Sequence, residues 1–173
     1  MEVNTIIKAQ HSSYQTRADE YNNLWVLNTA NILTYAHPKT VKYKFDDPFE
    51  FDAVAKAFNQ AFGLERLQEL EDNKDLHSIT YWISTEGKIL EIEFVTSVDT
   101  GLSIEELEAL ESALKSTVCF RLTWLDNEKA EFVSKNTSVS FEGIITRLRA
   151  PAGSVHTKVI SVVLTPPTPF GLK

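Results

Sequence analysis

The sequence predicts an α+β domain in which helices cover one face of an antiparallel sheet. Residues 39–124 carry strand and helix periodicities in the order β-α-β-β-α-β, typical of a ferredoxin-like core. Further strands, expected within residues 130–164, extend that sheet or form a second one. With 173 residues and 43% hydrophobic content, the chain suits one domain, 1–173. Residues 1–35 form its N-terminal arm or first elements, and 165–173 a proline-rich tail.

The first strand and helix of this core follow from alternation and capping. Val41, Tyr43 and Phe45 alternate with two lysines, which predicts a strand with one buried face. Asp47 and Pro48 then match the N-cap and the first helical position. Apolar residues follow at helical spacing: Phe51, Val54, Ala55, Phe58, Ala61 and Phe62. We expect Gly63 to end or bend this helix, and a second helical stretch to run from residue 64 to about residue 71.

A β-hairpin is the clearest local unit. Residues 79–84 and 90–94 alternate between apolar and polar side chains, and Glu86 and Gly87 suit a two-residue loop. The predicted register pairs Ile83 with Leu90, Tyr81 with Ile92, Ile79 with Phe94, Trp82 with Glu91, and Thr80 with Glu93. The last two pairs lie on the face away from the hairpin's own core.

A capped helix and several strands complete the expected elements. Ser103 and Glu106 form an S-x-x-E capping box before a leucine-rich stripe. The expected later strands are 118–124, 130–135, 139–148 and 155–164. Residues 1–23 suggest a helix or irregular arm, and 24–35 could be helix or strand.

Residues 77–124 resemble the C-terminal domain of TonB-type periplasmic proteins. The resemblance rests on the hairpin 79–94, the turn at Gly101, the leucine-rich helix and the strand at 118–122. It implies a module that binds an extended segment of a partner along a sheet edge, without catalysis.

The charge distribution argues against several classes of partner. The formal charge of −7 makes nucleic acid unlikely, and no apolar run is long enough to span a membrane. Residues 46–131 are strongly acidic, whereas the expected late strands carry a small basic group. That group consists of Lys135, Arg147, Arg149 and Lys158. It could dock a partner or a second copy of the chain, or be neutralised within the fold.

The residues able to support chemistry are few. Glu91 and Glu93 share a strand face at a separation of roughly 6.5 Å, compatible with glycoside hydrolysis, although a solvated face is the simpler interpretation. The histidines His11, His37, His77 and His156 show no metal-ligand spacing. The single cysteine, Cys119, lies in an expected strand, where packing is its usual role. We therefore expect no metal and no cofactor.

The predicted function is a non-catalytic binding or adaptor domain acting through a sheet face or an edge strand. The candidate binding residues are Trp82, Thr80, Glu91, Arg147 and Arg149, and the expected partner is a protein. Trp82 could stack on a partner or be covered by residues 1–35. The alternatives are a small hydrolase with a dispersed carboxylate or histidine site, and a purely structural subunit of a homo-oligomer.

The N-terminus lacks the basic and apolar regions of a signal peptide. As it stands, the sequence suggests a cytoplasmic protein. If Met1 replaces a removed signal peptide, the protein is periplasmic or secreted.

Overall fold

The computed structural model describes residues 1–36, 39–47, 50–71, 76–125 and 127–150. In chain order, its elements are β1 (Ile6–Lys8), β2 (Ser13–Ala18), β3 (Asn23–Asn28), the 3-10 helix η1 (Leu33–Tyr35), β4 (Tyr43–Phe45), α1 (Phe51–Glu71), β5 (Leu76–Ser84), β6 (Ile89–Ser97), α2 (Ile104–Thr117), β7 (Leu122–Trp124), β8 (Phe132–Ser138) and α3 (Phe141–Arg149). The described strands form a six-stranded sheet of order β1-β2-β3-β6-β5-β8 and a β4–β7 pair. All their pairings are antiparallel, which confirms the predicted α+β class.

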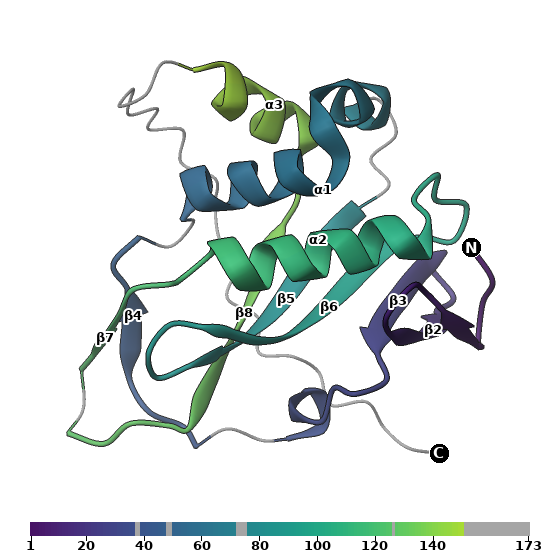
Figure 1. Cartoon of the computed structure of the whole chain (residues 1–173). Helices are drawn as coiled ribbons and strands as arrows, with labels where there is room; N and C mark the ends of the chain where they lie inside the picture. Colours follow the sequence, from purple (N-terminus) through teal and green to yellow (C-terminus); the bar gives the residue numbers. More distant parts are fainter. Residues whose placement is uncertain (37–38, 48–49, 72–75, 126, 151–173) are drawn as a thin grey trace.

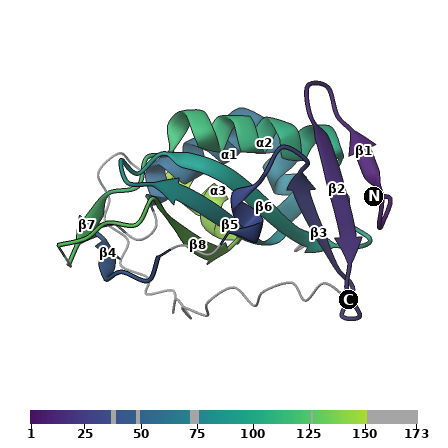
Figure 2. The ribbon, with the colours of Figure 1, turned by 90° about the horizontal axis from the view of Figure 1, so that it is seen from below.

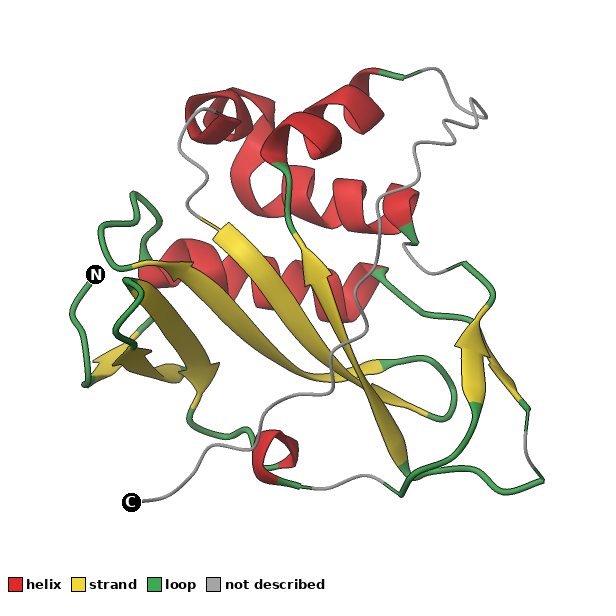
Figure 3. Cartoon of the chain, turned by 180° about the vertical axis from the view of Figure 1, so that it is seen from behind, coloured by secondary structure: helices red, strands yellow, loops and turns green. Residues whose placement is uncertain are grey.

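The α-helices α1, α2 and α3 lie on one face of the six-stranded sheet (Figure 1; Figure 3, from behind). Helix α2 packs on β6, and α1 contacts both α2 and α3. The core lies between these layers and includes Phe58, Tyr81, Phe94 and Leu107. Seen from below, β1 and β2 lie at one end of the sheet and the β4–β7 pair at the other (Figure 2). None of the described helices is long and apolar enough to cross a bilayer.

The predicted order of elements over residues 39–124 is present, but the ferredoxin-like strand order is not confirmed. The first and last strands of that unit, β4 and β7, pair with each other through Tyr43 opposite Trp124 and Phe45 opposite Leu122. In a ferredoxin-like sheet, β4 would pair with β6, but that edge of β6 pairs with β3 instead. Residues 13–28 form the β2–β3 hairpin, so the expectation of a helix or irregular arm over 1–23 was wrong. Tyr14 and Thr16 alternate with exposed residues and are buried, a strand pattern that their polar neighbours concealed.

The central hairpin has the predicted register over most of its length. Four of the expected pairs are present: Ile79–Phe94, Thr80–Glu93, Tyr81–Ile92 and Trp82–Glu91. The fifth was wrong, because an irregularity after Trp82 pairs Ile83 with Ile89 and leaves Leu90 41% exposed.

The N-terminal caps of α1 and α2 involve predicted residues, and that of α1 differs in detail from the prediction. Ser103 and Glu106 form the predicted capping box of α2. The side chain of Asp47 accepts a hydrogen bond from the Glu50 amide at 3.2 Å, but α1 begins at Phe51, so Asp47 does not directly precede the helix. Pro48 lies outside the described residues. The predicted bend at Gly63 is confirmed, with φ +73° inside α1.

The C-terminal region differs most from expectation. The expected strand 139–148 was wrong, because residues 141–149 form α3, which Ser140 caps by accepting from the Gly143 amide at 3.1 Å. Its buried residues Phe141, Ile144 and Ile145 recur at helical spacing. The expected strand 130–135 corresponds to β8, and that at 118–124 shortens to β7 with an isolated bridge from Cys119 to Lys88. The expected strand 155–164 and the tail 165–173 lie outside the described residues.

Candidate functional site

Among the described strands, β8 is at one end of the six-stranded sheet, and alternate residues of it direct their backbone groups away from β5. The Val139 amide donates to the His77 carbonyl at 3.1 Å, and the register continues from there as Thr137 opposite Ile79 and Lys135 opposite Tyr81. Because hydrogen-bonding residues alternate along an antiparallel strand, the N–H and C=O groups of Ser134 and Asn136 point away from β5. The hydroxyl of Tyr43 donates to the Ser134 carbonyl at 3.4 Å, which agrees with this direction.

A hollow of about 180 Å³ lies beside the first half of β8. One wall is the segment that leads into β4, and the other is the start of β8. The lining residues are Lys39, Thr40, Val41, Tyr43, Phe132, Val133 and Ser134. The hollow therefore adjoins the outward-facing backbone at the start of β8.

Lys135 is a buried cation on this same strand. It is 4% exposed, and its ammonium lies 4.7 Å from the centre of the Phe45 ring. Burial lowers the pKa of Lys135, and the nearby charge of Asp47 opposes that shift. An inward-pointing charge on an end strand discourages indiscriminate pairing with other chains. We infer that the buried charge of Lys135 disfavours pairing of β8 with unrelated strands.

The sheet face opposite the helices carries the residues that the sequence singled out. Trp82, Thr80, Glu91 and Glu93 are 4%, 6%, 7% and 4% exposed, respectively. The interpretation of the two glutamates as a solvated face was therefore wrong. Trp82 is covered, which was one of its two sequence-based interpretations. Thr80 accepts a hydrogen bond from the Asn136 side chain at 2.9 Å.

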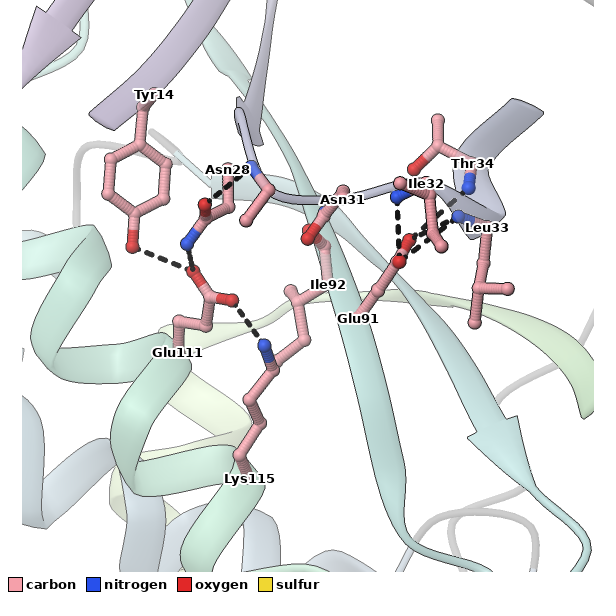
Figure 4. A network of polar contacts seen from close by, with 11 residues as sticks. Tyr14, Asn28, Asn31, Ile32, Leu33, Thr34, Glu91, Ile92, Glu111 and Lys115 are labelled. Atoms are coloured by element: carbon pink, nitrogen blue, oxygen red, sulfur yellow. Dashed lines mark hydrogen bonds and ion pairs between the residues drawn. The ribbon is translucent and has the colours of Figure 1, made fainter. Parts of the chain in front are cut away.

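Glu91 anchors the segment around η1 (Figure 4). Its carboxylate accepts from the amide of Ile32 at 2.7 Å, of Leu33 at 2.9 and 3.0 Å, and of Thr34 at 3.3 Å. At the preceding residue, the side chain of Asn31 donates to the Ile92 carbonyl at 2.8 Å. These amides begin η1 and would otherwise lack acceptors. This role could not be predicted from the sequence, because the donors are backbone amides, which nearly every residue type has.

We predict that Glu91→Ala lowers the free energy of unfolding by about 2 kcal/mol, because it leaves amide groups without a charged acceptor. Glu91→Gln keeps one acceptor oxygen and should recover part of the loss. Urea unfolding measures both variants, and hydrogen exchange should show faster exchange at the amides of residues 32–34. Wild-type stability with unchanged exchange in Glu91→Ala would refute the anchoring role.

Glu93 is buried without a hydrogen-bond partner for one of its oxygens. Its Oε2 has no partner among the described residues, and Leu27 and Thr80 lie opposite it on the two neighbouring strands. Burial raises the pKa of Glu93 to about 7. The two glutamates thus have different environments, one bound by backbone amides and one desolvated. The first is not free to act as a base or nucleophile, which weakens the two-carboxylate hydrolase interpretation.

Glu111 joins the N-terminal strands to α2 (Figure 4). It accepts from the Tyr14 hydroxyl at 2.7 Å, from Lys115 at 2.6 Å and from the Asn28 side chain at 3.4 Å. Burial, with the neighbouring carboxylate, raises the pKa of Tyr14. This cluster explains how β2 and β3 are held against the helix layer. Its sequence signal, a glutamate between apolar helix positions, was indistinguishable from an exposed one.

The predicted basic group does not converge on one surface. Arg147 forms an ion pair with Asp52 of α1, and its guanidinium lowers the pKa of that carboxyl. Arg149 is exposed at the end of α3. Lys135 is buried on β8, and Lys158 lies outside the described residues. For Arg147, the contact matches the interpretation of neutralisation within the fold.

The histidines and the cysteine do not gather either. His77 contacts the Asn23 side chain at 3.1 Å, and the backbone amide of His11 donates to Glu108. His37 and His156 lie outside the described residues. Within the described ranges, no three His, Cys, Asp or Glu side chains are placed to hold a metal ion. Cys119 is exposed, with its Sγ 3.6 Å from the Glu86 carbonyl oxygen.

Comparison with known proteins identifies a protein of similar fold and gives no function. No family model and no curated protein matches the chain. Among solved structures, a DUF5043 family protein from Bacteroides uniformis is similar, with a TM-score of 0.64 and 16% sequence identity. The match covers 80% of this chain and 91% of that one. At this identity, the likeness shows that the two chains share a fold.

Proposed function

We propose that this chain is a non-catalytic binding domain that takes up an extended segment of a protein partner along β8. The observation that carries the proposal is the direction of the β8 backbone. The N–H and C=O groups of Ser134 and Asn136 point away from β5, and strand addition uses such groups as its main source of affinity. Of these groups, the Ser134 carbonyl accepts from the Tyr43 hydroxyl, and a partner strand would have to replace that bond.

The two ends of the six-stranded sheet are not equivalent. At the far end, β1 has three residues, whereas β8 has seven and adjoins the hollow lined by Tyr43 and Phe132. A longer strand offers more backbone groups, and a neighbouring hollow offers a place for a side chain. The buried Lys135 disfavours unspecific pairing at the same strand. These features favour β8 as the edge that meets a partner.

Because Trp82 is covered, we propose binding at the β8 edge and not on the sheet face. At 4% exposure, Trp82 has little surface to offer a partner, and the same holds for Thr80 and Glu91. The TonB-like resemblance of residues 77–124 implies binding along a sheet edge, but it does not include β8 (Phe132–Ser138), so we retain it in the proposal only for the mode of binding.

The test is selection of peptides from a random 12-residue display library on the purified chain. Ser134→Pro removes an outward N–H without touching the bonds to β5, so it should fold and lose at least ten-fold in peptide enrichment. Ile6→Pro on β1 is the matched control at the other end of the sheet and should retain enrichment. Equal enrichment by wild type and Ser134→Pro, with both folded, would refute strand addition at β8.

A further inference from the structure

The β4–β7 pair is bonded internally as a unit. In the described part of the chain, it forms a two-stranded sheet of its own. At one end, the Leu125 amide donates to the Lys42 carbonyl at 2.9 Å. At the other end, the Asp46 amide donates to the Arg121 carbonyl at 2.9 Å, and the Asp46 carboxylate accepts from the Thr123 hydroxyl at 2.7 Å. Because these bonds lie within the pair, a movement of the whole pair relative to β8 leaves them intact.

One end of the pair is anchored to the core of the domain. Phe120, just before β7, is buried, and its amide donates to the Gly87 carbonyl at 2.8 Å. Its ring centre lies 5.4 Å from that of Tyr81 and 5.7 Å from that of Phe45. Tyr43, paired with Trp124, lies nearer the other end of the pair. Residue 120 is therefore the place about which the pair would turn.

Two side chains of β4 contact neighbouring residues of β8. The Phe45 ring covers the ammonium of Lys135, 4.7 Å from the ring centre. The Tyr43 hydroxyl donates to the outward-facing Ser134 carbonyl at 3.4 Å, which is long for a hydroxyl donor and therefore weak. Burial raises the pKa of Tyr43, so its hydroxyl remains a donor at neutral pH. Tyr43 thus binds a carbonyl that an added strand would use.

We propose that the β4–β7 pair is an intramolecular competitor for the β8 edge. In the closed arrangement described here, Tyr43 holds the Ser134 carbonyl and Phe45 covers Lys135. A partner strand displaces the pair, which turns about residue 120. The closed arrangement lowers the apparent affinity for the partner, because only the open fraction of molecules binds. This inference rests on the proposed function and adds the regulation of the same edge.

Tyr43→Phe tests the competition through peptide affinity. It removes the hydroxyl and keeps the ring, so it should raise the affinity for a selected, Ser134-dependent peptide about three-fold, as expected for the loss of one weak hydrogen bond from the closed arrangement. Tyr21→Phe, at an exposed tyrosine of the turn between β2 and β3, is the matched control and should leave the affinity unchanged. Calorimetric titration measures the affinities, and circular dichroism checks that both variants fold.

Acetylation of Lys135 by acetic anhydride follows the opening itself. Lys135 is buried, whereas Lys8 on β1 is exposed and serves as the reference within the same molecule. Tyr43→Phe without peptide should raise the rate at Lys135 relative to Lys8 about three-fold. Saturation of the wild type with the peptide should raise it at least ten-fold, because the pair is then displaced. Mass spectrometry of the digested protein measures both rates.

The outcomes separate the competition from strand addition. If Ser134-dependent peptides bind Tyr43→Phe and wild type equally, the competition is overturned and strand addition stands. Weaker binding by Tyr43→Phe would also overturn it, because the hydroxyl would then belong to the peptide site. An unchanged rate at Lys135 on peptide binding would exclude displacement of the pair. Failure of the Ser134→Pro comparison would instead remove the proposed function, and this inference with it.

Discussion

Gly87→Ala is expected to lower the free energy of unfolding by about 4 kcal/mol, among the largest effects of a single substitution in this chain. Gly87 has φ +85°, and a Cβ there would lie 1.8 Å from the Phe120 carbonyl oxygen. The Phe120 amide also donates to the Gly87 carbonyl at 2.8 Å. The clash is with backbone, so relief requires the hairpin turn and residue 120 to separate. Urea or thermal unfolding measures the loss.

Gly63→Ala separates backbone strain from the clash. Gly63 also has a positive φ of +73°, but nothing lies within 4 Å of an added Cβ. It should therefore cost about 1 to 2 kcal/mol, which reflects strain alone. Equal losses for the two variants would contradict the close approach of the turn to Phe120.

Glu93 is expected to make the protein less stable as pH rises from about 4.5 to above 7. Burial raises the pKa of Glu93 from 4.5 to about 7, so the folded state holds a proton that the unfolded state releases. Stability is then lost as pH rises between these two values, by about 3 kcal/mol in total. Glu93→Gln cannot ionise, so this contribution should disappear and the variant should be more stable than wild type at pH 8. Chemical unfolding from pH 4 to 9 measures both profiles.

Glu65→Gln is the matched control, at an exposed position of α1. It should keep the wild-type profile. Parallel stability profiles for wild type and Glu93→Gln would show that this carboxyl is solvated in the folded protein.

The helix layer and the central hairpin could be predicted because their signals are local. The capping box at Ser103 and the alternation through Tyr81 and Ile92 specify both an element and its buried face. The partners of the strands could not be predicted. The sequence of Tyr43 and Phe45 indicates a strand, but its pairing with β7 depends on β3 having taken the edge of β6.

The same distinction explains the candidate site. The strand expected at 130–135 overlaps β8 (Phe132–Ser138), yet nothing local shows that Ser134 lies on the last of the described strands of the sheet. The role of Glu91 could not be predicted either, because its carboxylate binds backbone amides of residues 32–34, which are distant in sequence. Residues 139–148, which include Arg147, were expected to form a strand but form α3. The apolar residues of this short segment fit both a strand and an amphipathic helix.

Under the proposed function, the covered sheet face and β8 have different roles. Glu91 and Trp82 are buried and belong to the stability of the fold. Ser134 and Asn136 present backbone groups away from it, and the hollow lies at the same strand. A mutation on the face should change unfolding more than peptide capture, and a mutation at the edge should do the reverse.

Hydrogen exchange of the β8 amides, with and without a selected peptide, tests the central claim most directly. In the free protein, the amides of Val133, Lys135 and Thr137 bond to β5 and should already exchange slowly. On peptide binding, the amides of Ser134 and Asn136 should slow by at least ten-fold while the odd-numbered ones change little. Slowed exchange at β1 or on the sheet face, with Ser134 and Asn136 unchanged, would contradict strand addition at β8.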